Sequence, residues 1–130
     1  MPRPKNEHEG YLGNPNVKKD GVESQFSEDE IKEYRQCMMD PGYFAINYLK
    51  VISLDDGLVP FKLYPYQKNM FKHFNDNRFS VILACRQSGK SISGVAYLLW
   101  YACFHPEKTI AILANKGATA REMLARITLM

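Results

Sequence analysis

The residue types that can do chemistry gather in the stretch 84–91, which reads Ala-Cys-Arg-Gln-Ser-Gly-Lys-Ser. Gly-Lys-Ser between a short β-branched run and a long apolar run is typical of a phosphate-binding loop. Backbone N–H groups at a helix N-terminus bind anions, and Gly89 lets the backbone approach a phosphate closely. In such a loop, Lys90 contacts the β- and γ-phosphates and the Ser91 hydroxyl binds Mg²⁺.

One departure from the usual motif is clear. Ala84 stands where the first glycine of G-x-x-x-x-G-K-[ST] normally lies. The alternative interpretation of the stretch is a basic turn between a strand and a helix, with no ligand.

A second informative residue is Gln67, which lies about 20 residues before the loop. Pro65 favours the first turn of a helix here, so Gln67 falls near the start of that helix. Its amide carries a donor and an acceptor together, which matches N6 and N7 of adenine. A surface glutamine with no ligand is the alternative, and only its position before the loop favours adenine.

The loop needs a strand before it and a helix after it. The run 79–83 predicts the strand, and the apolar run from about Ser91 to Phe104 predicts a buried helix. The continuous apolar run 109–114 predicts a buried parallel strand, and a further helix begins near Ala120. Strand, helix and strand form one βαβ unit with a right-handed crossover. The pattern therefore predicts an α/β fold, and two parallel strands alone indicate the front part of a larger domain.

The N-terminal half divides in two. Residues 1–26 are polar and rich in Pro and Gly, which is typical of a flexible arm. Ser27 and Glu30 form a capping box that starts a helix, and Asp40 with Pro41 starts a second helix whose end the pattern leaves open. A turn at 55–57 precedes a short edge strand over 58–63. We therefore expect a helical subdomain over 27–62 and the P-loop part over 63–130.

Composition limits which partners, membrane associations and cysteine chemistry we expect. The 130 residues carry a net charge of +3, which neither requires nor excludes a nucleic-acid partner. No apolar run of membrane-spanning length and no signal peptide is visible, so we expect no membrane association. Three cysteines without metal-ligand spacing are typical of reduced thiols.

Three segments, 63–67, 85–91 and 112–117, resemble in order and spacing the large terminase subunit of T4-like tailed phages. That protein is the ATP-driven motor and nuclease that packages viral DNA. Its variant phosphate loop carries an Arg-Gln pair ahead of Gly-Lys-Thr/Ser and lacks the first glycine, as seen here at Arg86 and Gln87. The resemblance covers about Phe26 to Met130 and implies a P-loop NTPase with a helicase-like or terminase-like parallel sheet, incomplete because it stops before the Walker B strand.

The resemblance also implies the ligands and the residues that hold them. ATP and Mg²⁺ are the expected cofactors, with Lys90 and Arg86 catalytic, Ser91 on the metal, and Lys116 on the phosphate backbone of DNA. The nucleotide contacts are Tyr66, Gln67, Arg86, Gln87, Ser88, Gly89, Lys90 and Ser91. For Arg86, a phosphate anchor without a rate role is the alternative to a γ-phosphate sensor, and Lys116 is equally well read as a solvated loop lysine.

The implied partners are viral double-stranded DNA, the portal protein and the small terminase subunit, with the full-length protein in a homo-oligomeric ring in the cytoplasm of the infected bacterial host. No apolar run ending in Asp-Glu follows the loop, so we expect this chain alone to hydrolyse ATP poorly or not at all. A superfamily 2 helicase-like motor and a non-enzymatic interaction module are the alternatives.

Overall fold

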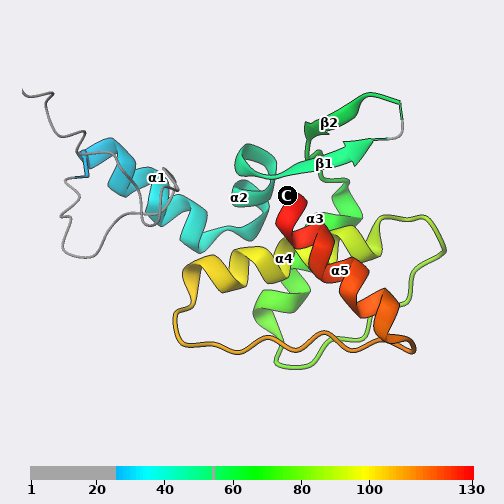
Figure 1. Ribbon diagram of the computed structural model, residues 1–130. Helices are drawn as coiled ribbons and strands as arrows, with labels where there is room; N and C mark the ends of the chain where they lie inside the picture. The colour runs from blue at the N-terminus through cyan, green and yellow to red at the C-terminus, as the bar shows by residue number, and fades with distance from the viewer. Residues whose placement is uncertain (1–25, 54) are drawn as a thin grey trace, which may run out of the picture. The chain divides into compact units, whose positions relative to one another are not determined.

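The computed structural model describes residues 26–53 and 55–130, so nearly all of the expected arm over 1–26 lies outside the described residues. The chain divides into two compact units, Met1–Ile31 and Lys32–Met130. The described residues form five α-helices and one two-stranded antiparallel sheet (Figure 1). In chain order the elements are α1 (Glu28–Met39), α2 (Pro41–Tyr48), β1 (Lys50–Ser53), β2 (Gly57–Pro60), α3 (Pro65–Asp76), α4 (Lys90–Phe104) and α5 (Gly117–Leu129).

Local capping chemistry sets where the first helices begin. Glu30 N–H donates to Ser27 Oγ at 3.2 Å while Ser27 N–H donates to Glu30 Oε2 at 2.8 Å, which is the predicted capping box at the start of α1. Asp40 Oδ1 accepts from Gly42 N–H at 2.7 Å, and Pro41 occupies the first turn of α2. Both predicted helix starts are therefore confirmed.

A β-hairpin follows α2. The helix ends at Tyr48, and β1 pairs with β2 in an antiparallel register that places Val51 opposite Val59. The predicted turn is present, and Gly57 adopts φ +71° within it, a backbone conformation that glycine allows. Pro60 closes β2, so the missing N–H of the proline costs little at this edge position.

The core lies among α2, α3, α4 and the loop segments beside the hairpin. Its buried members are Ala45, Leu49, Phe61, Phe71 and Ala96. Trp100 on α4 is also buried, and its indole Nε1 donates to the Cys37 carbonyl of α1 at 2.7 Å. This bond satisfies a buried donor and fixes the C-terminal part of α1 against α4.

The prediction of an α/β fold with a parallel P-loop sheet is wrong. The described residues contain one strand ladder, the antiparallel β1–β2 pair, and the runs 79–83 and 109–114 form no strand in it. A buried parallel strand needs cover on both faces. Here Val81, Leu83 and Leu113 have exposed fractions of 97%, 101% and 88%, so one face of each run is open. Both runs are extended connections that travel in the same direction below the helices in Figure 1.

No helix among the described residues has the length and apolar character needed to cross a bilayer.

The exposure of Leu83 leads to a stability prediction. Leu83→Ala should change the free energy of unfolding by no more than about 0.5 kcal/mol, because the side chain is solvent-exposed. Phe71→Ala, at a core position exposed by only 2%, should cost about 3–5 kcal/mol. Urea titration of both variants checks this. A loss above about 2 kcal/mol for Leu83→Ala would show instead that the run 79–83 is buried in solution.

A second prediction concerns the contact between α1 and α2. The Tyr43 and Tyr48 hydroxyls donate to the Glu33 carboxylate at 3.0 and 2.9 Å, and the bond to Glu33 raises the pKa of Tyr48 from 10.0 to about 12. Because the folded-state pKa is raised, the stabilisation is complete below pH 10 and is lost as the pH rises toward 12.

Glu33→Gln should therefore lower the pKa of Tyr48 toward 10 and flatten the decline in unfolding free energy between pH 10 and 12. The pH titration of the Tyr48 ring resonances by NMR measures this directly. An unchanged Tyr48 pKa in the variant would mean that the hydroxyl does not bond to Glu33.

Candidate functional site

The predicted loop-to-helix junction is present, although the strand before it is not. A turn over residues 86–89 leads into α4, and Gly89 is its N-cap residue with φ +75° and ψ 12°. The Gly89 carbonyl accepts from Ser93 N–H at 3.0 Å and from Ser93 Oγ at 2.9 Å. Gln87 also adopts a left-handed backbone, with φ +61°, which is unusual for a residue other than glycine. The first N–H groups of α4 therefore adjoin a tightly turned loop, the arrangement in which helix ends bind anions.

The Lys90 side chain folds back onto the backbone of this loop. Its Nζ donates to the Cys85 carbonyl at 3.1 Å and to the Ala84 carbonyl at 3.4 Å. The Ser88 hydroxyl donates to the same Cys85 carbonyl at 2.9 Å. The ammonium group thus lies beside the N-terminus of α4, and the two carbonyls hold it there. These two bonds were not predicted from the sequence, because every residue has a main-chain carbonyl and residue type does not indicate which one Lys90 will contact.

Gln67 lies beside the loop, next to Gly89. Its side chain is only 2% exposed, and Oε1 accepts from Tyr64 N–H at 2.9 Å, which caps the first turn of α3. A Cβ placed on Gly89 would meet Gln67 Nε2 at 2.7 Å, so any other residue there requires the Gln67 amide to shift. Oε1 keeps a second lone pair, and the amide group therefore has capacity for a further hydrogen bond.

Tyr66 joins α3 to the loop. Its hydroxyl donates to the Ser88 carbonyl, and 43% of the residue remains exposed. Its ring is stacked on that of Tyr64, with centroids 5.8 Å apart and planes inclined by 6°.

Three further predicted site residues, in the turn and in the first turn of α4, differ in exposure. Arg86 and Gln87 are exposed in the turn, and Arg86 forms no ion pair within the part of the chain that the structure describes. Ser91 is half-buried in the first turn of α4. Residues 26–53 and 55–130 contain no group of three or more His, Cys, Asp or Glu side chains suited to a metal ion. A single serine hydroxyl fits Mg²⁺, which takes most of its ligands from phosphates and water.

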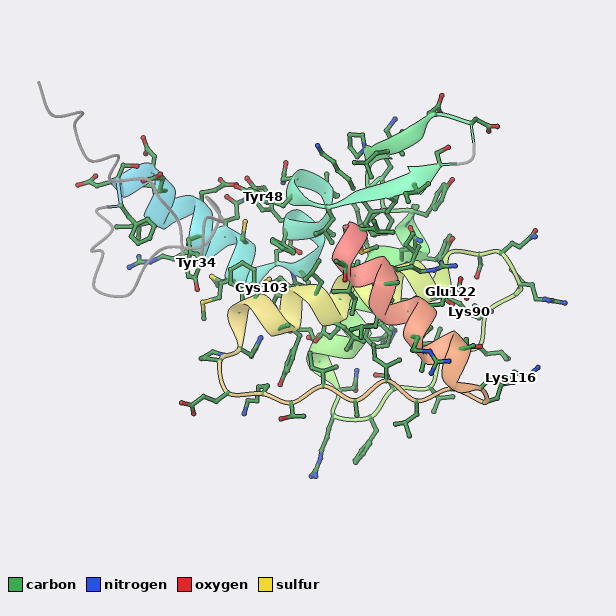
Figure 2. All side chains as sticks on the ribbon, viewed as in Figure 1. Tyr34, Tyr48, Lys90, Cys103, Lys116 and Glu122 are labelled. Atoms are coloured by element: carbon green, nitrogen blue, oxygen red, sulfur yellow. The ribbon has the colours of Figure 1, made fainter. Side chains whose placement is uncertain are left out.

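Lys116 occupies a comparable place on α5. It is exposed, and its carbonyl accepts from Thr119 and Ala120 N–H groups in the first turn of that helix. Figure 2 shows Lys90 and Lys116 on the same side of this view, where α4 and α5 begin. The structure thus places both lysines at helix starts, and no contact between them is recorded.

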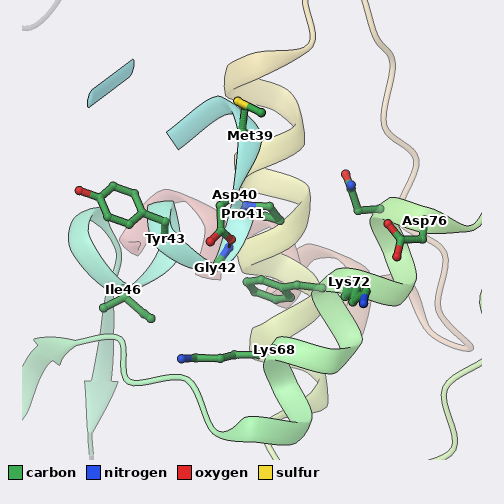
Figure 3. Close-up of a pocket in the computed structure, with 11 residues that line it drawn as sticks. Met39, Asp40, Pro41, Gly42, Tyr43, Ile46, Lys68, Lys72 and Asp76 are labelled. Atoms are coloured by element: carbon green, nitrogen blue, oxygen red, sulfur yellow. Dashed lines mark hydrogen bonds between the residues drawn. The ribbon is translucent and has the colours of Figure 1, made fainter. Parts of the chain in front are cut away.

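A hollow of about 490 Å³ lies away from the loop, between the start of α2 and α3 (Figure 3). Lys68 and Lys72 line one side of it, and Asp40 and Pro41 line the other. None of its lining residues belongs to 84–91, so this hollow is separate from the loop site.

The geometry of Gly89 leads to a prediction with an internal control. Gly89→Ala should lower the free energy of unfolding by about 1–2 kcal/mol, because alanine is strained at φ +75° and its Cβ would meet Gln67. Gly94→Ala should raise it by about 0.5–1 kcal/mol, since nothing lies within 4 Å of that Cβ in the interior of α4. Chemical denaturation measures both. Equal effects would show that the left-handed cap is absent.

A search of the chain against models of known protein families finds no match.

Proposed function

We propose that this chain binds ATP in the loop 85–91, with the triphosphate at the N-terminus of α4 and the adenine edge at Gln67. The observation that carries the proposal is the close approach of Gly89 and Gln67. Two segments about 20 residues apart each have chemistry suited to a nucleotide, one for phosphates and one for a base. The structure brings them into contact, which neither a surface glutamine nor a basic turn requires.

Each residue of the loop has a distinct part in this proposal. Backbone N–H groups of the loop and of the first turn of α4 bind phosphate oxygens, and Lys90 moves from the carbonyls of Ala84 and Cys85 onto the β- and γ-phosphates. Ser91 holds Mg²⁺ beside them. Arg86 is exposed in the adjoining turn, where its planar guanidinium can anchor the γ-phosphate.

For the full-length protein we propose the activity of a phage large terminase subunit, which uses ATP to move viral DNA into a prohead. The three segments 63–67, 85–91 and 112–117 support this proposal, and Lys116 is its DNA-backbone contact. Double-stranded viral DNA, the portal protein and the small terminase subunit are the proposed partners, in the host cytoplasm. Because no Asp-Glu pair follows an apolar run, we expect ATP binding by this chain without rapid hydrolysis.

The exposed apolar residues favour a second candidate function. Every second residue of the run 79–83 is apolar and exposed: Phe79 by 82%, Val81 by 97% and Leu83 by 101%. Such a row is typical of a surface that pairs with another polypeptide. A non-enzymatic interaction module would use this row and would need no nucleotide, so ATP affinity separates the two candidates.

The proposal predicts that Lys90→Ala weakens ATP binding on the order of 30-fold or more, because charge-assisted hydrogen bonds to phosphate are lost. Isothermal titration calorimetry with Mg-ATP measures the affinity. Lys108→Ala is the matched control, since it removes an equal charge from an exposed position outside the loop. Both variants should unfold at the temperature of the wild type to within a few degrees.

Equal ATP affinities for Lys90→Ala and the wild type would overturn the loop assignment. A wild-type chain that binds no ATP would favour the interaction module.

A further inference from the structure

One hydrogen bond connects the phosphate loop to α3, which does not adjoin the loop in the chain. Among the described residues, hydrogen bonds that reach 85–89 come from the loop itself, from Lys90 and Ser93 on α4, and from Tyr66 on α3. The Tyr66 hydroxyl donates to the Ser88 carbonyl in the middle of the turn. Tyr66 is therefore the side chain that connects this turn to the helix that carries Gln67.

The chain that precedes the loop gives it little support. The run before it forms no ladder, and Leu83 is fully exposed. In the proposed nucleotide complex, Lys90 leaves the Cys85 and Ala84 carbonyls, so two of the bonds that hold the turn are lost as phosphate binds. The Tyr66–Ser88 bond uses neither Lys90 nor an N–H group needed for phosphate, and it can persist throughout binding.

We propose that Tyr66 is a positioning residue that holds the phosphate loop in its anion-binding shape through the Ser88 carbonyl, and that it acts on the phosphates of the nucleotide and not on the base. This inference rests on the proposed nucleotide binding. Its physical basis is preorganisation, because a turn held in one shape loses less conformational freedom when phosphate binds.

The test removes a single hydroxyl. Tyr66→Phe keeps the ring and its stacking on Tyr64 but deletes the donor to Ser88. The control is Tyr64→Phe, which deletes the hydroxyl of the neighbouring ring, for which no bond to the loop is recorded. Calorimetry with Mg-ATP and with inorganic triphosphate, on the full chain well below its melting temperature, gives two affinities per variant.

We expect Tyr66→Phe to weaken ATP and inorganic triphosphate by the same factor, about fivefold, which is the usual net effect of one neutral hydrogen bond. Tyr64→Phe should change each affinity by less than about twofold. A loss for ATP alone would make Tyr66 a base contact and would overturn the inference. Unchanged affinities with a lowered melting temperature would make its role purely structural, with the same consequence.

The failure of the proposed function gives a different result. If the wild-type chain binds neither ATP nor inorganic triphosphate, the nucleotide site itself is absent, and the role of Tyr66 is rejected with it. If the wild type binds both and Tyr66→Phe binds both equally well, only the positioning role is rejected.

Discussion

The close packing of Gly89 against Gln67 is the constraint on which the candidate site depends. Gly89 is left-handed where the chain turns into α4, and Gln67 Nε2 occupies the space that a Cβ at this position would take. The loop therefore lies directly against the first turn of α3. The bond from the Tyr66 hydroxyl to the Ser88 carbonyl is a second contact between α3 and the loop.

Gln67 has a structural role in α3 in addition to the adenine contact proposed for it. Its Oε1 caps α3 by accepting from Tyr64 N–H, so the residue has a reason to be buried that involves no ligand. The same cap fixes the orientation of the amide group, which directs Nε2 toward Gly89. A glutamine held in this way loses little side-chain entropy on binding a base. At 2% exposure the amide has to become accessible for the proposed adenine contact, in which Oε1 would use its second lone pair.

The parts of the structure that could be predicted from the sequence are those set by local chemistry. Ser27, Asp40 and Pro65 predicted helix starts because capping and proline preferences act over three or four residues. Gln67 and Lys90 were both predicted to bind one nucleotide, but the contact between α3 and the loop was not predicted. The carbonyl partners of Lys90 and the hydroxyl bond of Tyr66 are set by tertiary geometry, for which residue type gives no signal.

The prediction of parallel strands was wrong because an apolar run favours burial but does not ensure that other elements cover it. Val81 and Leu113 lie in runs with strong β-propensity, yet a strand forms only when a neighbour completes the ladder and elements cover both faces. The described residues place their helices against one side of these runs, so the other face remains in water. The β1–β2 hairpin forms its ladder without a crossover connection, because its two strands are adjacent in the chain and are joined by a tight turn. The loop and α4 form nevertheless, because their geometry is set by Gly89, by the bonds of Lys90 and by the packing against α3, none of which requires a sheet.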